Sequence, residues 1–448
     1  MSPNRSVRSF GRTRQLRSPS PGQEERQPRS ARESSFRSLQ VRNYRLYWFG
    51  QSVSQLGTWL SLTAMSWMVL TQLGGNASHV GFLAASQFLP TLIFGTWAGA
   101  ISDRVDVRRL LLCTQTALLV VASLVAVLTY AGVIQLWMVF PLVAAQGMCT
   151  AFDNPGRQTF VSELVGPDLI PNAVALNSAG FNAARIVGPG LAGIIIAAAG
   201  TQLCFALNAV SYLAAIAALL LVHKDDLFAR PAVQKAKGQI RDGFRYARDE
   251  PVLRNTLLTM AVVGTVSMNF TVLVPLLART TFKTGAGSFG LLSTAMGVGS
   301  LVGALLAARR TTPNLTTIAW GALGLGVAMF AAAASPVLPV AMIAVAGCGV
   351  FVMTYLAATN SVLQLNARPD MRGRVLSLYL VLFIGTSPIG SPFVGEIAER
   401  FGTRAAFSYG AAGALVGAAI AHHRRHATAT PLVPVVRETA LTAEGATT

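Results

Sequence analysis

The chain has 448 residues, of which 52% are hydrophobic and 12% are charged, and its mean hydropathy is +0.51. Soluble domains carry about 25% charged residues, so the composition excludes an ordinary soluble domain and indicates a chain solvated largely by lipid. The net charge of +18 does not indicate a nucleic-acid binder, because Lys and Arg gather before residue 45 and between apolar runs, not on a folded basic domain.

Residues 1–43 are rich in Arg, Ser, Pro and Gln and contain few apolar residues. Such a segment cannot bury a core, so it predicts a disordered tail. No apolar stretch of signal-peptide length precedes residue 44, which argues against a secretory signal peptide. Two alternatives stay open: an over-extended start codon, and electrostatic attachment of the arginines to anionic lipid.

Apolar runs of membrane-crossing length then follow one another to residue 422. A crossing needs about 20 apolar residues, and the Gly and Pro within several runs are tolerated in membrane helices. The pattern predicts an all-α polytopic membrane protein with twelve transmembrane helices. They are expected at about 45–72, 79–101, 109–131, 135–156, 171–199, 202–222, 253–280, 287–308, 315–334, 337–363, 373–398 and 404–422.

The distribution of Lys and Arg predicts the orientation. If the N-terminus is inside, cytoplasmic segments hold 31 of the 36 basic residues. The outer loops hold only Arg279, Lys283, Arg400 and Arg404, and Arg185 lies inside a span. Because cytoplasmic loops are enriched in Lys and Arg, we expect a multi-pass protein of the cytoplasmic membrane with both termini in the cytoplasm.

The spans divide into two halves, at 44–222 and 253–422, with a cytoplasmic tail at 423–448. In the basic linker at 223–252, Ile240, Phe244 and Ala247 recur at helical spacing, which fits either an amphipathic helix on the inner leaflet or a solvated linker helix. A repeat at an offset of 202 residues supports duplicated helix packing. It pairs Phe181 with Phe383, Gly188 with Gly390, Gly193 with Gly395, and Gly200 with Gly402.

Three local motifs stand out. The loop after the second span runs from Gly99 through Asp103, Arg104, Asp106, Arg108 and Arg109. The fourth span ends in Asp153-Asn154-Pro155-Gly156-Arg157, and the fifth contains Gly188-Pro189-Gly190 followed by Gly193. With these motifs the chain resembles the major facilitator superfamily, and more narrowly its enterobactin-exporter-like branch.

The resemblance implies two six-helix halves and roles for the motifs. The residues Gly99, Asp103, Arg104, Arg108 and Arg109 would form a cytoplasmic latch between the halves, with Asp153 and Arg157 near the inner interface as exchanging partners. Plain positive-inside charge and a solvated helix end are the alternatives. The motif of Gly188, Pro189, Gly190 and Gly193 is similar to one found in antiporters and is expected to seal the outer side, or only to kink the helix. Val143 stands where many antiporters have an arginine.

Arg185 is the charged residue expected nearest the membrane midplane. A charge there costs about 3 kcal/mol unless it faces protein or water, so we expect it to line a central cavity beside Asn182. It would bind an anionic substrate group, respond to a carboxylate, or form a structural ion pair.

Further polar residues are candidates for the cavity wall. Gln51, Ser54, Gln55 and Thr58 form one stripe on the first span, and Asn269, Tyr355 and Asn360 are weaker candidates; all of them could instead bridge helices. Asp153 and Glu396 are the protonatable residues within the spans, and therefore the candidates for proton coupling.

These features predict a secondary transporter that exports a siderophore, drug or amphiphilic metabolite by proton antiport with alternating access. It would act as a monomer in the lipid bilayer, without a nucleic-acid partner. No phosphate loop, catalytic set or metal-ligand cluster is present in the sequence, so we expect neither enzyme activity, cofactor nor metal. An importer on the same fold and a transport-silent membrane sensor or partner protein are the alternatives.

Overall fold

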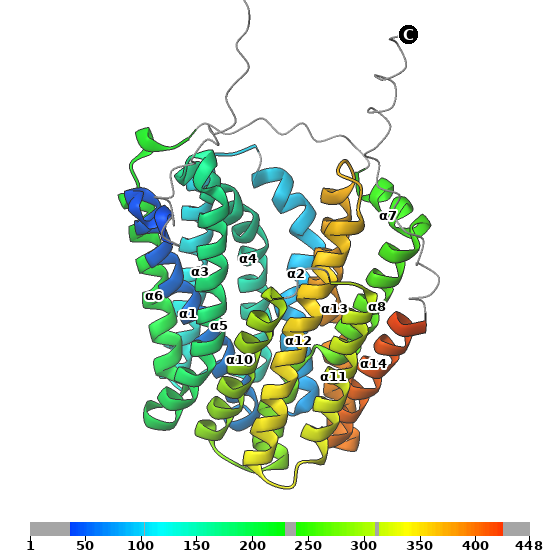
Figure 1. Ribbon diagram of the computed structural model, residues 1–448. Helices are drawn as coiled ribbons and strands as arrows, with labels where there is room; N and C mark the ends of the chain where they lie inside the picture. The colour runs from blue at the N-terminus through cyan, green and yellow to red at the C-terminus, as the bar shows by residue number, and fades with distance from the viewer. Residues whose placement is uncertain (1–35, 103, 229–238, 310–312, 424–448) are drawn as a thin grey trace, which may run out of the picture.

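The computed structural model describes residues 36–102, 104–228, 239–309 and 313–423 (Figure 1). This part of the chain is helical and contains no strand. The first half holds α1 (Arg42–Thr71), α2 (Ala77–Ser102), α3 (Val107–Tyr130), α4 (Leu136–Leu164), α5 (Ile170–Ala199) and α6 (Thr201–Leu221). After the linker helix α7 (Gln239–Asp249), the second half holds α8 (Pro251–Ser267), α9 (Phe270–Leu276), α10 (Ala286–Ala308), α11 (Leu315–Ala334), α12 (Leu338–Asn366), α13 (Arg372–Phe401) and α14 (Thr403–His423).

The expected spans agree with these helices closely at most ends. Apolar runs in lipid must satisfy every backbone N–H and C=O within the segment, which makes helices of crossing length. Eleven segments among the described residues are long and apolar enough to cross a membrane. The polar helix α1 is not one of them, although its thirty residues pack against α5 and α6. The twelfth crossing therefore stays a prediction.

The seventh predicted span is interrupted, which the hydropathy pattern did not indicate. The helix α8 ends at Ser267 and α9 begins at Phe270. The Asn269 side chain bridges the break, because its Nδ2 donates to the Thr265 carbonyl at 2.8 Å while its Oδ1 accepts from Ser391 of α13 at 2.9 Å. The broken backbone thus stays bonded inside the bundle.

The two halves repeat the same architecture. Three helix pairs, α4 with α12, α5 with α13 and α6 with α14, have equal lengths and lie 202 residues apart. The turns before α6 and α14 use Gly200 and Gly402, with φ of +81° and +87°, a backbone conformation that glycine adopts without a steric penalty. The internal repeat seen in the sequence is therefore a repeat of structure.

The linker helix α7 packs on the second half. Asp242 forms an ion pair of 3.4 Å with Arg374, and the Tyr246 hydroxyl accepts from the backbone N–H of Arg368 at 3.1 Å. Of the residues that suggested amphipathicity, Ala247 is buried and Phe244 is exposed, while the side chain of Ile240 lies outside the described part. The described section of the linker is thus fixed to the start of α13.

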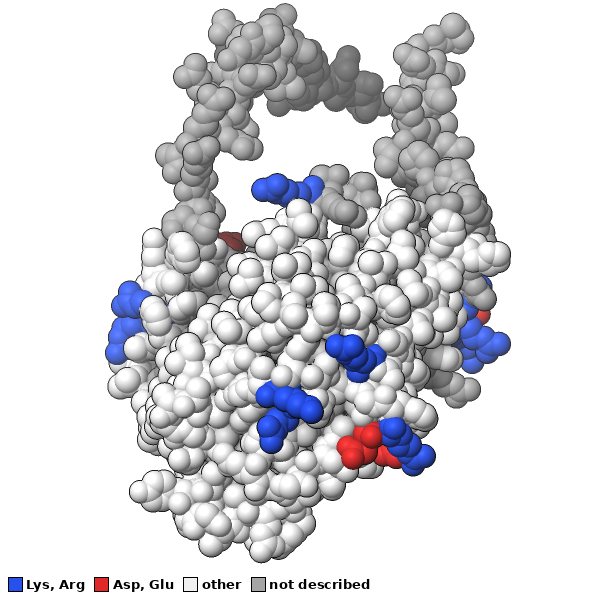
Figure 2. Space-filling view, turned by 90° about the horizontal axis from the view of Figure 1, so that it is seen from below, with Lys and Arg blue, Asp and Glu red and all other residues white. Residues whose placement is uncertain are grey.

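The halves meet along two helix pairs, α2 with α13 and α5 with α10. Figure 1 shows the described helices running roughly parallel, with the linker helix α7 at the upper end. The opposite end, seen in Figure 2, is mostly uncharged, and its acidic side chains lie beside basic ones. The contacts along these two helix pairs therefore determine where the two halves touch each other.

Candidate functional site

The pair α5–α10 closes one side of the interface with small residues. A Cβ built on Gly193 would lie 2.5 Å from the Cα of Gly290, so the two backbones touch. A Cβ on Gly188 would lie 2.6 Å from the Cβ of Trp59 on α1. The glycine–proline motif therefore packs α5 against both α1 and the second half, from the middle of the helix toward the end opposite α7.

The pair α2–α13 closes the other side with an equivalent contact. A Cβ on Gly395 would lie 2.7 Å from the Ala77 carbonyl oxygen. Gly395 and Gly193 are 202 residues apart, and each faces the first turns of the opposite half's second helix. We call these two contacts between the halves the α5–α10 seam and the α2–α13 seam. They are related by the same pseudo-symmetry as the halves.

Carboxylates distinguish the α2–α13 seam. Glu399 accepts a hydrogen bond of 2.9 Å from the backbone N–H of Ala77, and Glu396 accepts one of 2.7 Å from the Ser78 hydroxyl. An anion at a helix N-terminus is stabilised by the free N–H groups and the helix dipole. The equivalent positions on α5 are Ile194 and Ala197, so one seam is polar and the other is apolar.

Glu396, one of the two proton-coupling candidates, therefore lies at this seam. It also pairs with Arg400 one turn further along α13. The nearby His79 on α2 bonds the Asn76 backbone N–H through its Nδ1 at 3.2 Å. Glu396 is far along its helix from the bundle centre, and its role in coupling stays a prediction.

Toward the end that carries α7, α2 has no close neighbour on its glycine face. A Cβ built on Gly95 or Gly99 would have no described atom of another helix within 4 Å. The seam contacts involve residues 77–92 of α2 and 385–399 of α13. The close contacts between α2 and α13 therefore lie toward the end opposite α7 and do not extend to Gly95 and Gly99.

The residues expected to form a latch are engaged within the first half. Arg108 donates to the carbonyl oxygens of Leu219 and Leu220 at the end of α6, at 2.7 and 2.9 Å. Asp106 caps α3 by accepting from the Arg109 backbone N–H at 3.1 Å. Arg104 is exposed, and Asp103 lies outside the described residues. A latch between the halves stays a prediction for another conformation.

Asp153 is deeper than expected. Because α4 continues to Leu164, well beyond the expected end near residue 156, Asp153 lies inside the first half with 1% exposure. It pairs with Arg157 and accepts hydrogen bonds of 2.8 Å from the Thr114 hydroxyl and from Gln115 Nε2 on α3. A buried carboxylate bonded so fully joins α3 to α4.

Most of the polar stripe on α1 also points into the first half. With its amide oxygen turned toward α4, Gln51 accepts from Arg157 Nη2 at 3.0 Å. Ser54 is fully buried, and the Thr58 hydroxyl bonds the Tyr212 hydroxyl of α6 at 3.2 Å. Only Gln55 keeps partial exposure without such a bond.

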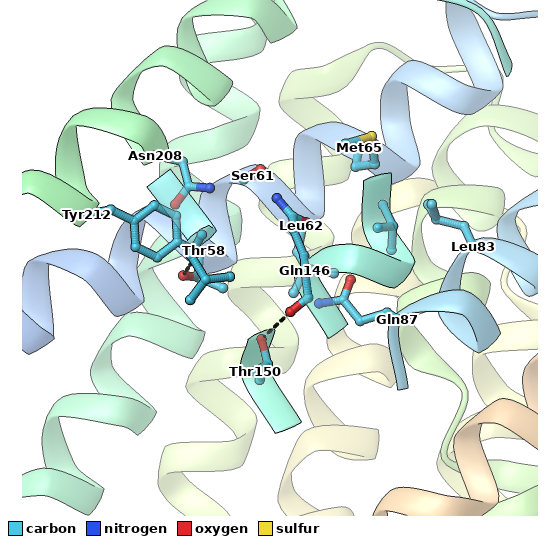
Figure 3. Close-up of a pocket in the computed structure, with 12 residues that line it drawn as sticks. Thr58, Ser61, Leu62, Met65, Leu83, Gln87, Gln146, Thr150, Asn208 and Tyr212 are labelled. Carbon is cyan, nitrogen blue, oxygen red and sulfur yellow. Dashed lines mark hydrogen bonds between the residues drawn. The ribbon is translucent and has the colours of Figure 1, made fainter. Parts of the chain in front are cut away.

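Thr58 lines a small polar cavity within the first half, shown in Figure 3. Gln87, Gln146, Asn208 and Tyr212 also contribute polar groups to its wall. Its volume of about 20 Å³ is enough for a water molecule, which needs about 10–15 Å³. The cavity is too small for an organic substrate.

At the equivalent positions the second half carries no charged residue and, along the cavity wall, mostly apolar or small ones. At an offset of 202, Asp153 and Arg157 correspond to Tyr355 and Thr359. The cavity-lining residues Gln146, Thr150, Asn208 and Tyr212 correspond to Cys348, Val352, Gly410 and Ala414. The same backbone is therefore held together by different chemistry in its two halves.

Arg185 occupies the middle of α5. It lies fifteen residues after the first residue of the helix and fourteen before the last, about 21 Å from either end at 1.5 Å per residue. Its guanidinium carbon lies 5.9 Å from the ring centroid of Trp59. It is partly exposed, and among the described residues no carboxylate lies within ion-pair distance of it.

The face of α5 that carries Arg185 holds three polar side chains. Ser178, Asn182 and Arg185 follow helical spacing, and the first two are exposed. At about 100° per residue, they lie roughly opposite Val187 and Ile194, two exposed apolar side chains of the same helix, whereas the exposed side chains of Val174 and Phe181 lie beside the polar ones. With α1 and α10 on its flanks, this polar face is directed between the halves.

The three weaker cavity candidates lie apart from this face. Asn269 is 1% exposed and is used at the α8–α9 break, and Tyr355 is fully buried. Asn360 accepts from Gln364 on its own helix. Of the residues expected to line the cavity, Arg185 and Asn182 are thus brought together, and most of the others are engaged elsewhere.

Sequence reasoning missed several residues that these sites use. Trp59, Thr114, Gln115 and Glu399 had no motif to mark them. Trp59 is one of six tryptophans in an apolar chain, and only the packing of α1 on α5 shows which one meets Arg185. Glu399 lies just beyond the expected eleventh span, and only the packing of α13 on α2 shows that it bonds a neighbouring helix.

The fold and its seams are those of a membrane transporter of the major facilitator type. The profile of the transmembrane secretion effector family matches residues 33–434, and the chain belongs to that family. The proteins it resembles are transporters. The expected branch of the superfamily is thereby confirmed.

Two curated relatives cover most of the chain. The staphyloferrin A transporter of Staphylococcus aureus is 26% identical over 381 residues, 81% of this chain and 91% of that protein. The multidrug efflux pump Tap of Mycolicibacterium fortuitum is 28% identical over 374 residues, 80% of this chain and 90% of that protein.

Solved structures support the fold at lower identity. A bacterial homologue of the human lysosomal transporter Spinster, in an inward-facing and unoccupied conformation, superposes with a TM-score of 0.66 and 13% identity, covering 86% of this chain and 96% of that one. A POT family transporter in complex with a thioalcohol-conjugated peptide gives 0.70 and 11%, covering 87% and 97%.

Proposed function

We propose that the protein exports a small molecule across the cytoplasmic membrane by proton antiport with alternating access. The observation that carries the proposal is the asymmetric closure of the halves. The glycine contacts of both seams run from one end of the bundle to about its middle, where Gly297 meets Ile186 and Gly385 meets Leu92, and the glycine face of α2 lacks close neighbours toward the other end. A bundle closed at one end and open at the other is one state of an alternating-access cycle.

The basic residues relate this state to the membrane. With the positive-inside distribution, the open end faces the cytoplasm, where an exporter loads its substrate. The glycine–proline motif at the α5–α10 seam, of the kind found in antiporters, agrees with export. So do the efflux pump and the siderophore transporter among the relatives. The protein would act as a monomer, since each chain contains both halves.

Everted membrane vesicles from an efflux-deficient bacterial host test this proposal. An acidic vesicle lumen is generated by respiration, and the accumulation of a panel of dyes and drugs is measured with and without a protonophore. We expect vesicles that contain the protein to accumulate at least one compound and to release protons as they do so. The protonophore should abolish both signals.

The other results have distinct meanings. Accumulation that ignores the protonophore would refute proton antiport and leave export standing. Faster loss of preloaded compound from everted vesicles would refute export and indicate an importer. The control variant is Arg45→Gln, which removes one arginine at an exposed position at the start of α1 and should leave the accumulation unchanged.

A further inference from the structure

The charges inside the spans do not balance. Three charged residues lie in the middle turns of the described spans: Asp153, Arg157 and Arg185. Asp153 and Arg157 neutralise each other within the first half. Glu396, nearer the closed end, is paired with Arg400 and bonded to Ser78. Arg185 is left as a cation without a counter-ion among the described residues.

An isolated cation near the bilayer midplane is unfavourable by several kcal/mol unless water or an anion compensates it. The polar face formed by Ser178, Asn182 and Arg185 lies between the halves, where a ligand can reach it. Asn182 donates to the Ser178 carbonyl within its own helix, and its Oδ1, for which no donor is found among the described residues, can accept from a donor group of a ligand. The compensating anion is therefore expected to arrive with the substrate.

Aromatic side chains border the same cation. Trp59 lies under the guanidinium, and Phe181 meets the Trp59 ring edge-on with centroids 5.9 Å apart. Phe181 is 44% exposed. Such rings bind flat apolar groups by stacking, and their positions set an apolar surface directly beside a positive charge.

We propose that the substrate is an amphiphilic organic anion, whose carboxylate or similar group pairs with Arg185 while its apolar part packs on Trp59 and Phe181. This inference rests on the proposed transport function and specifies the cargo at the site between the halves. It excludes permanently cationic compounds as preferred substrates, because Asp153, the carboxylate in the middle turns of the described spans, is already paired with Arg157.

Equilibrium binding to the purified full-length chain in a neutral detergent tests the substrate class without any gradient. The probes are carboxyfluorescein, an aromatic anion, and ethidium, an aromatic cation, followed by fluorescence polarisation. We expect carboxyfluorescein to bind about tenfold or more tightly than ethidium, and added salt to weaken it. Arg185→Gln should weaken anion binding by about tenfold or more, as the loss of one member of a desolvated charge pair does.

Two further variants separate binding from folding. Arg185→Lys keeps the charge and should retain most of the affinity for the anion, whereas Trp59→Ala should weaken it with Arg185 intact. The Arg45→Gln control should bind like the unmodified chain. Equal binding of the two dyes, no binding of carboxyfluorescein, or unchanged anion affinity in a folded Arg185→Gln variant would overturn the inference.

Failure of this inference is distinguishable from failure of the proposed function. Anion binding that depends on Arg185, without proton-dependent accumulation in vesicles, would support the substrate class and refute antiport. Proton-dependent export of ethidium, with binding that ignores Arg185, would support antiport and refute the substrate class.

Discussion

Replacing Asp153 with Asn tests whether the buried pair on α4 is structural. Asp153 is 1% exposed, and the side chain of its partner Arg157 is 18% exposed. An asparagine in the same position keeps one oxygen for Thr114 and Gln115 but presents an N–H₂ group toward the guanidinium. The substitution thus leaves a mostly buried cation without its counter-ion.

The expected cost follows from that geometry. Breaking a buried pair by removing one member costs about 3–5 kcal/mol. Because Arg157 retains some contact with solvent and with Gln51, we expect the lower end, about 3 kcal/mol. This is a factor of about 10² in the ratio of folded to unfolded protein, at about 1.4 kcal/mol per tenfold.

Thermal and denaturant unfolding of the purified protein in detergent, followed by tryptophan fluorescence, would measure this cost. The double variant Asp153→Asn with Arg157→Gln serves as the control, since it removes both charges and should lose less than the two single variants added together. A single Asp153→Asn variant within about 1 kcal/mol of the unmodified protein would refute the structural reading. It would also return Asp153 to the list of residues free to exchange protons.

Two further predictions concern the closed end, read by distances between spin labels at Ala131 and Phe401, which are exposed in opposite halves. Gly193→Ala inserts a methyl group where the backbones of α5 and α10 touch, and overpacking of about 1–3 kcal/mol should raise the open population about tenfold. The control variant Gly95→Ala should leave the distances unchanged. Equal behaviour of the two variants would contradict the role of the α5–α10 contact. Glu399→Gln removes a negative charge that stabilises the N-terminus of α2 by about 0.3–1 kcal/mol, and it should raise the open population two- to fivefold. An unchanged or smaller open population would contradict a role of Glu399 in holding the α2–α13 seam closed.

Span positions could be predicted from the sequence because lipid imposes the same requirement on every residue of a crossing. That requirement acts through average apolarity, so it locates helices and says little about their ends in water. The fourth span is the example, since its polar final turns around Arg157 continue as helix beyond the apolar run. The interruption at Asn269 was also hidden, because it depends on a hydrogen bond from Ser391, 122 residues away.

The candidate site was only partly accessible to the same reasoning. Arg185 was identified because a charge among apolar residues is visible in one helix alone. Its neighbour Trp59 and the seam residue Glu399 depend on which helices touch, and helical periodicity does not specify that. The spacing of the polar stripe on α1 correctly places its residues on one face of the helix. Spacing does not show which helices pack against that face, and in the structure these are α4 and α6.

The contrast between the two interiors bears on how the halves respond to strain during a transport cycle. Directional bonds around Asp153 and the water-sized cavity hold the first half in one arrangement, which allows little sliding before a bond breaks. In the second half, α10 meets α12 through Gly299 and Gly303 against backbone atoms, and the α8–α9 break supplies a point of bending. We therefore expect the first half to rotate as a rigid body, and the second half to deform internally as the molecule changes state.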